Sequence, residues 1–412
     1  MRVSLLADVR RLPRAAWTLA VGALINRFGT FVLVFLALYL KSLGVPVARI
    51  GLVLGMYGVG ALGASGAGGV LADALGRRNT IVFSMVSAAC VLVTLAFVHS
   101  VAWIMVFTVL AGFCSELYRP AAAALLTDVT TPDQRVTAFA LYRLAINLGM
   151  GLGPAVGGLL IKRSYSLLFG ADALTSLAFG AVALAALPRS TEPDARPRGS
   201  ADAARVMFSD RRFMLFLLAS TLAALVYMQS HTTFPLQVLN YGHSARLYGL
   251  LLSLNGLIVV LIELPVTTWT RRRNPYATMF VGFATVAVGF GLTAYARGAP
   301  ALAATVTLWT VGEVIVVPVA AAWVANAAPD DMRGRYQGAF GMTWAIGAIL
   351  APVIGARIFA VSGVYLWRAC FVTCLTGGLI ALSLPLFSRG LAAKRSAIPP
   401  DADVVDDLRG PQ

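Results

Sequence analysis

Twelve long apolar segments constrain the fold of this chain more than any other feature. Each is close to the roughly 20 residues that an α-helix needs to cross a bilayer. Of the 412 residues, 58% are hydrophobic and 12% are charged, and the mean hydropathy is +0.79. Because a soluble domain carries about 25% charged residues, the composition predicts an all-α membrane protein with twelve transmembrane helices. The segments cover residues 15–40, 50–71, 80–98, 101–125, 136–161, 165–187, 213–239, 248–269, 276–295, 301–326, 336–360 and 365–387.

The order of helix breakers and loop charges repeats once along the chain. Four short motifs recur at offsets of 195 to 198 positions, and this agreement argues against chance. Such a repeat predicts two pseudo-symmetric six-helix bundles packed around a central axis. The pairs are Arg77-Arg78-Asn79 with Arg272-Arg273-Asn274, Pro120 with Pro318, Gly153-Pro154 with Ala351-Pro352, and Pro132-Asp133 with Pro329-Asp330.

Polar stretches separate the predicted bundles from each other and from the end of the chain. The central stretch is rich in proline, arginine, aspartate and serine, which predicts a linker. The last stretch has the composition of a disordered tail. The predicted organisation is a cytoplasmic N-terminus (1–14), an N-terminal six-helix bundle (15–188), a cytoplasmic linker (189–212), a C-terminal six-helix bundle (213–388) and a cytoplasmic tail (389–412).

Arginine and lysine are distributed unevenly between the two sets of loops. With both termini inside, 22 basic residues lie on the cytoplasmic side, 6 lie in outer loops and 5 lie within the spans. Cytoplasmic loops of membrane proteins carry an excess of these residues. We therefore expect a multi-pass protein of the inner (plasma) membrane with both termini in the cytoplasm. The net charge of +15 follows from this bias and does not indicate nucleic-acid binding.

A short polar hinge joins the second and third apolar segments. Its sequence is Gly69-Val70-Leu71-Ala72-Asp73-Ala74-Leu75-Gly76-Arg77-Arg78. Gly76 allows the tight turn between two spanning helices, and the charges of Asp73, Arg77 and Arg78 lie at the membrane face. This loop resembles the signature loop of the major facilitator superfamily of secondary transporters.

That resemblance implies a conformational latch at the cytoplasmic face. In the family, an acid at the end of the fourth helix pairs with the arginine of this loop, which here means Asp128 with Arg77. A latch of a few kcal/mol is enough to bias a two-state rocking motion. The alternative is an exposed ion pair worth about 0–1 kcal/mol. The predicted latch residues are Gly69, Asp73, Gly76, Arg77, Arg78 and Asp128.

The fifth segment contains closely spaced glycines and a proline: Gly149, Gly151, Gly153, Pro154, Gly157 and Gly158. Glycines at this spacing let a neighbouring helix approach closely, and the proline kinks the helix. The pattern resembles the fifth-helix motif of family members that act as exporters, although Ala140 stands where the longer motif has a glycine. Close packing without any bearing on transport direction is the alternative.

Charged side chains within the spans are the main functional candidates, because each is costly in a bilayer and needs a partner. An acid that is neutral on one side of the membrane and ionised on the other suits a proton-coupled carrier. The alternative is an ion pair that only holds helices together. The candidates for proton coupling or for the cavity are Arg27, Glu116, Arg143, Asp172, Glu263 and Glu313.

The resemblance further implies that the first, fourth, seventh and tenth helices line a central cavity. This adds Asn26, Gln229, His231 and Trp309 as candidates for contact with the substrate. A histidine such as His231 more often forms a hydrogen bond with a neighbouring residue.

No motif for hydrolysis or nucleotide binding is present in the sequence. The cysteines lie inside apolar runs without metal-ligand spacing, so neither a metal nor a cofactor is expected, and the chain is not predicted to be an enzyme. Transport therefore depends on an ion gradient or on the gradient of the substrate itself.

The prediction is a twelve-helix transporter that resembles the drug:proton antiporter branch of the superfamily. Besides the two motifs, the likeness rests on Asn26-Arg27-Phe28-Gly29-Thr30, Tyr118-Arg119-Pro120 and Asp172-Ala173-Leu174-Thr175-Ser176. It implies proton-driven export of small amphiphilic molecules by a protein that is a monomer in the lipid bilayer. Two alternatives stay open: a proton-coupled importer of a nutrient, and a sensor or scaffold, which the intact hinge disfavours.

Overall fold

The computed structural model describes residues 10–189, 207, 209–270, 273–328 and 333–387. Within these ranges there are twelve helical spans long and apolar enough to cross a membrane, and the described chain contains no strand. The all-α, twelve-helix prediction is therefore confirmed. Most of the predicted linker and the predicted tail lie outside the described residues, as does the segment before Arg10.

The helices fall into two groups along the chain. The first group is α2 (Arg14–Phe28), α3 (Phe31–Ser42), α4 (Val47–Leu75), α5 (Arg77–Phe97), α6 (Val101–Glu116), α7 (Tyr118–Asp128), α8 (Pro132–Leu160) and α9 (Tyr165–Ala186). The second group is α11 (Arg211–Tyr227), α12 (Gln229–Thr232), α13 (Phe234–Asn240), α14 (Ala245–Thr270), α15 (Pro275–Leu292), α16 (Ala299–Ala327), α17 (Arg333–Val361), α18 (Gly363–Ser383) and the 3₁₀ turn η2 (Leu384–Phe387).

Three of the predicted spans are broken instead of continuous. The first is divided into α2 and α3 at Gly29, where the side chain of Thr175 comes so close that it leaves no room for a side chain. The fourth is divided into α6 and α7 at Leu117, three residues before Pro120, whose ring nitrogen cannot donate a helical hydrogen bond. The seventh is divided into α11, α12 and α13, and Pro235 lies in the first turn of α13.

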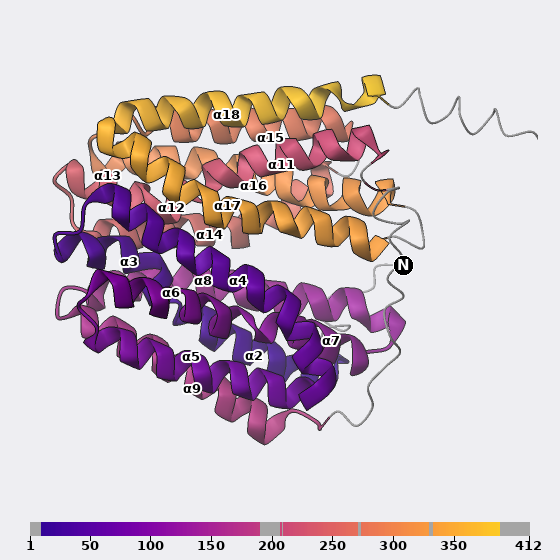
Figure 1. Cartoon of the computed structure of the whole chain (residues 1–412). Coiled ribbons are helices and arrows are strands. Elements are labelled where there is room, and N and C mark those ends of the chain that lie inside the picture. Colours follow the sequence, from indigo (N-terminus) through magenta and orange to yellow (C-terminus); the bar gives the residue numbers. More distant parts are fainter. Residues whose placement is uncertain (1–9, 190–206, 208, 271–272, 329–332, 388–412) are drawn as a thin grey trace, which may run out of the picture.

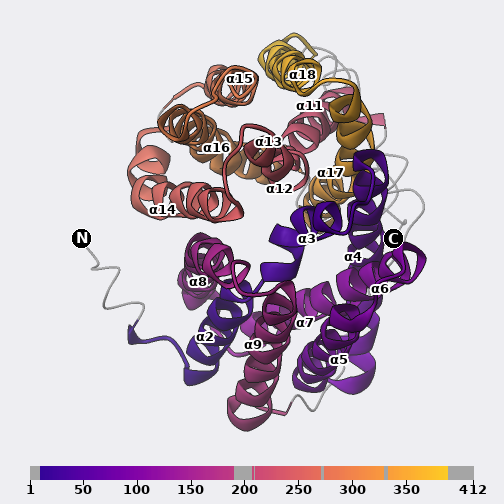
Figure 2. The same ribbon diagram turned by 90° about the vertical axis from the view of Figure 1, so that its left-hand side faces the viewer.

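The two groups form separate bundles, one below the other in Figure 1, and Figure 2 shows the same division from one end. The bundles meet along two helix pairs, α4 with α17 and α8 with α14. Glycines make these contacts close. A methyl group on Gly58 would lie 2.8 Å from the carbonyl carbon of Ala348, and one on Gly158 would lie 3.1 Å from Cα of Arg246.

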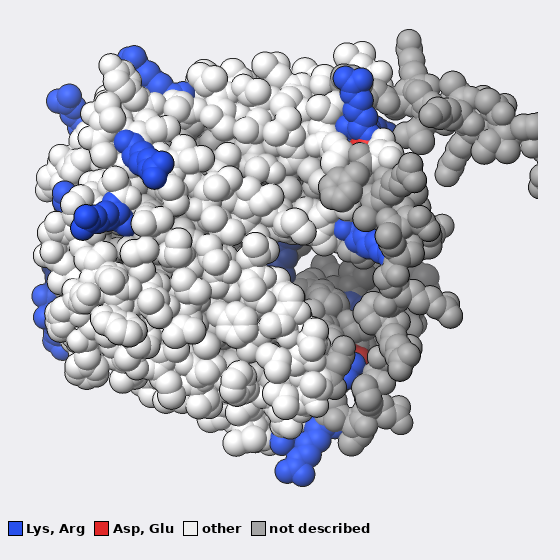
Figure 3. Space-filling view, viewed as in Figure 1, with Lys and Arg blue, Asp and Glu red and all other residues white. Residues whose placement is uncertain are grey.

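The two ends of the molecule differ. We call the end that carries the α4–α5 turn, the end of α9 and the start of α11 the linker end, and the opposite end the far end; the linker end is on the right in Figure 1. At the far end the bundles are joined: Tyr248 donates a hydrogen bond to the carbonyl of Val34 (3.2 Å), and α3 contacts α12 and α13. At the linker end, Figure 3 shows a recess between the bundles.

The lateral surface is apolar. Large hydrophobic side chains such as Phe97, Leu174 and Val372 are more than half exposed along it. In Figure 3 the blue lysine and arginine side chains lie mostly near the two ends, with a broad uncharged band between them. An uncharged band flanked by charge is the surface that a bilayer requires.

Candidate functional site between the two bundles

The site begins with a cavity of about 120 Å³ between the bundles. Helix α8 of the first bundle forms one wall, and α11, α12, α14 and α16 of the second bundle form the others. Because both bundles contribute to the wall, a molecule bound here contacts both. The lining residues are Asn147, Met150, Pro154, Tyr227, His231, Leu252, Asn255, Gly256, Val259 and Glu313.

Glu313 is the acid that lines this cavity. The side-chain amide of Asn255 donates a hydrogen bond to its carboxylate (3.1 Å), and the hydroxyl of Tyr227 donates another. Among the described residues, no lysine or arginine lies within ion-pair distance of Glu313. A carboxylate held by neutral donors inside a membrane protein can exchange a proton or a cation without first breaking an ion pair.

Glu263 of α14 links the two bundles. Its carboxylate accepts hydrogen bonds from the guanidinium of Arg143 and from the amide of Asn147 (3.4 Å), which both belong to α8. The Arg143 side chain is half exposed and that of Glu263 is 20% exposed, so the pair is not sealed inside either bundle. Arg143 and Glu263 also lie close enough to Glu313 to act on it electrostatically.

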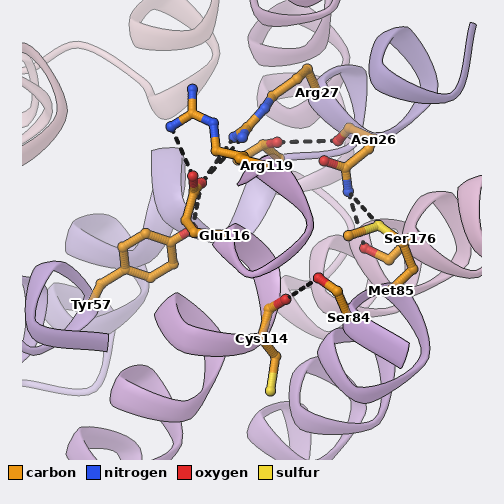
Figure 4. A network of polar contacts seen from close by, with 10 residues as sticks. Asn26, Arg27, Tyr57, Ser84, Met85, Cys114, Glu116, Arg119 and Ser176 are labelled. Atoms are coloured by element: carbon orange, nitrogen blue, oxygen red, sulfur yellow. Dashed lines mark hydrogen bonds and ion pairs between the residues drawn. The ribbon is translucent and has the colours of Figure 1, made fainter. Parts of the chain in front are cut away.

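A second charged cluster lies inside the first bundle, around Glu116 (Figure 4). Both terminal nitrogens of Arg27 donate to one carboxylate oxygen at 3.2 Å, and Arg119 donates to the other at 2.8 Å. The hydroxyl of Tyr57 lies 3.5 Å from the first oxygen. The side chains of Arg27 and Glu116 are 8% and 11% exposed, whereas that of Arg119 is 55% exposed. Glu116 is thus a buried, doubly paired carboxylate.

Asp172 contacts the break between α2 and α3. Its carboxylate accepts the backbone N–H of Val32 (3.0 Å). This N–H group belongs to the first turn of α3, where the helix offers it no carbonyl partner. Asp172 therefore stabilises the start of α3 within the first bundle, and it is not among the residues that line the central cavity.

The residues predicted to contact the substrate lie in different surroundings. His231 lines the central cavity, and its Nδ1 has no hydrogen-bond partner in the described part of the chain. Gln229 donates to the carbonyl of Ala351 (2.9 Å) and is buried. Trp309 is buried and stacked on Phe290. Asn26 donates to the hydroxyl of Ser176 (3.4 Å) within the first bundle.

The hinge between α4 and α5 is a tight turn at Gly76, whose φ of +82° favours glycine. Arg77 opens α5, followed by Arg78, and the Arg77 Nε lies 3.2 Å from a carboxylate oxygen of Asp128 at the end of α7. Asp73 lies in the last turns of α4, and its side chain is outside the described part of the structure. A methyl group on Gly69 would meet nothing within 4 Å, so Gly69 makes no close helix contact.

The glycines of α8 pack on two sides of the helix. Gly149 packs on α2, where an added methyl group would lie 2.8 Å from the carbonyl oxygen of Leu24; Gly153 also faces α2, and Gly157 faces α3. Gly151 and Gly158 instead face α14 of the other bundle. Next to Pro154, the backbone N–H of Ala155 donates to the hydroxyl of Ser253 (2.9 Å) on α14. The motif therefore packs α8 against its own bundle and against the opposite one.

Sequence reasoning overlooked three polar residues of the cavity: Asn147, Tyr227 and Asn255. They are uncharged, so the cost of burying a charge in a bilayer does not single them out. Asn147 lies one turn after Arg143 on the same face of α8, and that spacing is the signal that could have identified it.

The two bundles, the apolar lateral surface and the polar cavity between the bundles define a multi-pass membrane transporter. The family model of the Major Facilitator Superfamily matches residues 19–352 and, in a second alignment, residues 238–404. The chain therefore belongs to the Major Facilitator Superfamily.

Three relatives illustrate the range of the family that the chain resembles. It is 27% identical to the uncharacterised MFS-type transporter YqjV of Bacillus subtilis (strain 168), over 90% of this chain and 92% of that protein. It is 25% identical to a Na(+), Li(+), K(+)/H(+) antiporter of Planococcus maritimus, over 77% and 83%. It is 23% identical to the multidrug resistance protein MdtH of Cronobacter sakazakii (strain ATCC BAA-894), over 78% and 80%.

A solved structure supports the fold. The crystal structure of the peptide transporter POT in complex with sulfate superimposes with a TM-score of 0.75 at 16% identity, covering 94% of this chain and 99% of that one. At this identity the match establishes the fold alone. The relatives are transporters and not enzymes, and transporters of this kind bind small-molecule substrates.

Proposed function

We propose that the protein exports small amphiphilic molecules in exchange for protons, by alternating access of the cavity between the bundles. The observation that supports this most is Glu313, a cavity carboxylate held by Asn255 and Tyr227 with no ion-pair partner among the described residues. A group of this kind can bind either a proton or a positively charged donor on the substrate. The two ligands then compete for one site, which is the requirement for antiport.

In this proposal the protein lies in the plasma membrane. Its linker end faces the cytoplasm, and its far end faces the outside of the cell. The recess at the linker end admits the substrate from inside, while contacts at the far end close the outside. Rocking of the bundles then exposes the cavity to the outside, where protonation of Glu313 releases the substrate. Loss of the proton to the cytoplasm resets the carrier. We take the monomer as the transporting unit.

The contacts between the bundles have distinct roles in this cycle. Gly151 and Gly158 of α8, which face α14, and the pair of α4 and α17 hold the bundles together when the outside is closed. The hinge pair of Arg77 and Asp128 lies within the first bundle at the linker end, and in this proposal it acts as the latch. The Arg143–Glu263 ion pair connects the bundles beside the cavity, so it senses both the charge of Glu313 and the bundle arrangement.

The test is proton flux in liposomes that contain the purified protein, with an imposed pH gradient and a panel of cationic, neutral and anionic amphiphiles. We expect substrate-dependent proton movement opposite to substrate movement, and its loss in Glu313→Gln. The matched control is Glu116→Gln, studied at a temperature where it stays folded. If coupled export survives in Glu313→Gln, the assignment of the proton site is wrong. Movement of proton and substrate in the same direction would establish uptake by symport instead.

A further inference from the structure

A second cavity, of about 40 Å³, lies within the C-terminal bundle behind Glu313. It shares Glu313 and Tyr227 with the central cavity, so the two spaces meet at these side chains. Its walls are aliphatic and aromatic and come from α11, α15, α16 and α17. The remaining lining residues are Ser220, Ala223, Phe283, Val286, Val316, Val317, Ala320, Phe340 and Trp344.

Among the described residues that line this pocket, Ser220 carries the one hydroxyl besides that of Tyr227. The residue is only 7% exposed, and its hydroxyl has no hydrogen-bond partner in the described part of the chain. Serine in a helix usually bonds to the carbonyl four residues earlier, as the neighbouring Thr221 does with Leu217 (2.8 Å). A buried hydroxyl without a hydrogen-bond partner lowers the stability of the folded protein. A ligand that bonds to the Ser220 hydroxyl in this pocket would remove that cost.

Helix geometry sets the distance between the two polar ends of the pocket. Ser220 and Tyr227 are seven residues apart on α11, which corresponds to a rise of about 10 Å. On α16, which runs in the opposite direction, Glu313 and Ala320 have the same separation and also line the pocket. The pocket is therefore a narrow apolar slot with a carboxylate at one end and a hydroxyl at the other.

We propose that this slot binds the apolar body of the transported molecule, and that it selects slender molecules with polar groups at both ends. An ammonium group would lie at Glu313, and a hydroxyl or carbonyl roughly 10 Å away would bond to Ser220. Phe283, Phe340 and Trp344 supply the faces for the body between them. That the molecule bound in this slot is also the transported molecule rests on the proposed function; the binding itself does not.

The experiment measures binding to the purified full chain in nanodiscs by isothermal titration calorimetry, without a proton gradient. The probes are aminobutanol, amino-octanol and aminododecanol, which differ in length, and octylamine, which lacks the hydroxyl. We expect amino-octanol to bind about three- to tenfold more tightly than octylamine, the effect of one hydrogen bond, and more tightly than the shorter and longer alcohols.

Ser220→Ala should remove the preference for amino-octanol over octylamine and leave octylamine binding intact. The matched control Thr221→Ala, which loses a satisfied hydroxyl on the same helix, should retain the preference. Ser220→Ala should melt at the same temperature as the parent protein or higher, because it removes an unsatisfied group. Equal binding of the two probes to the parent protein, or an unchanged preference in Ser220→Ala, overturns the proposal. Since no proton flux enters this measurement, its outcome is separate from that of the export assay.

Discussion

The two bundles treat their central acids in opposite ways. In the N-terminal bundle, Glu116 is buried between Arg27 and Arg119, a cluster with a net charge of +1. In the C-terminal bundle, the hydrogen-bond donors to Glu313 among the described residues are both neutral, Asn255 and Tyr227. An acid between two arginines is held ionised and supports the helix packing, whereas an acid among neutral donors can change its charge at low cost. Under the proposed function, this difference separates an acid that stabilises the bundle, Glu116, from the acid that exchanges the proton, Glu313.

The largest effect that tests this comparison is on stability. We expect Glu116→Gln to destabilise the protein by about 3–5 kcal/mol, because the substitution leaves the buried guanidinium of Arg27 without a counter-charge. Glu313→Gln should change stability by less than about 1 kcal/mol, since the amide replaces a group that has no ionic partner in the described part of the chain. Thermal unfolding of both variants in detergent, with the parent protein beside them, measures the difference. Equal losses in the two variants would remove the distinction between the acids.

Much of this arrangement could be predicted from the sequence. The twelve spans follow from hydropathy, and the acids Glu116, Glu263 and Glu313 follow from the cost of charge in a bilayer. Which acid has an arginine beside it could not be predicted, because the partners are far apart in the chain: Arg27 is 89 residues from Glu116 and Arg143 is 120 residues from Glu263. Such contacts depend on how the helices pack.

The breaks in the helices could not be predicted from the pattern of apolar residues either. An apolar run of full length reads as one helix, yet the first span is divided at Gly29, where Thr175 of α9 approaches and Asp172 accepts the N–H of Val32. Trp309 illustrates the opposite case: it lies on a predicted cavity helix, but its face is directed at Phe290 and not at the cavity. The helix on which a residue lies can be predicted from the sequence. Whether its side chain points to the cavity or to a neighbouring helix depends on the packing.

The second effect concerns the pH dependence of binding. Protonation of Glu313 removes the charge that holds a cationic group, so we expect the affinity for octylamine to rise with pH, by up to about tenfold per pH unit, until the carboxylate is fully ionised. The slope should vanish in Glu313→Gln and persist in Glu263→Gln. Titration calorimetry at a series of pH values measures it. A slope that persists without Glu313 would mean that another group binds the proton.

The Arg143–Glu263 pair is intermediate between the two extremes, since it is ionic but partly exposed and shared between the bundles. We expect a coupling energy of about 1 kcal/mol from a double-mutant cycle of Arg143→Gln and Glu263→Gln. Spin labels on the two bundles at the linker end report, through their distance distribution, the populations of the two bundle arrangements. Loss of the pair should shift these populations, and their ratio in each variant gives the free energies of the cycle. Changes in stability without any change in that distance would reduce the pair to a packing contact.

The smallest expected effect is a difference in stability between variants of the two arginines that bind Glu116. Arg27 and Arg119 bind the same carboxylate, but their side chains are 8% and 55% exposed. Arg119→Gln should cost less than about 1 kcal/mol, because solvent screens an exposed pair and Arg27 still neutralises the acid. Arg27→Gln should cost more, since Arg119 cannot replace the two hydrogen bonds that Arg27 makes from within the bundle. Thermal unfolding of the two variants gives the comparison. If Arg119→Gln were the more damaging, the buried contact could not be what makes Glu116 structural, and the cluster would resemble the cavity acid more closely than its geometry indicates.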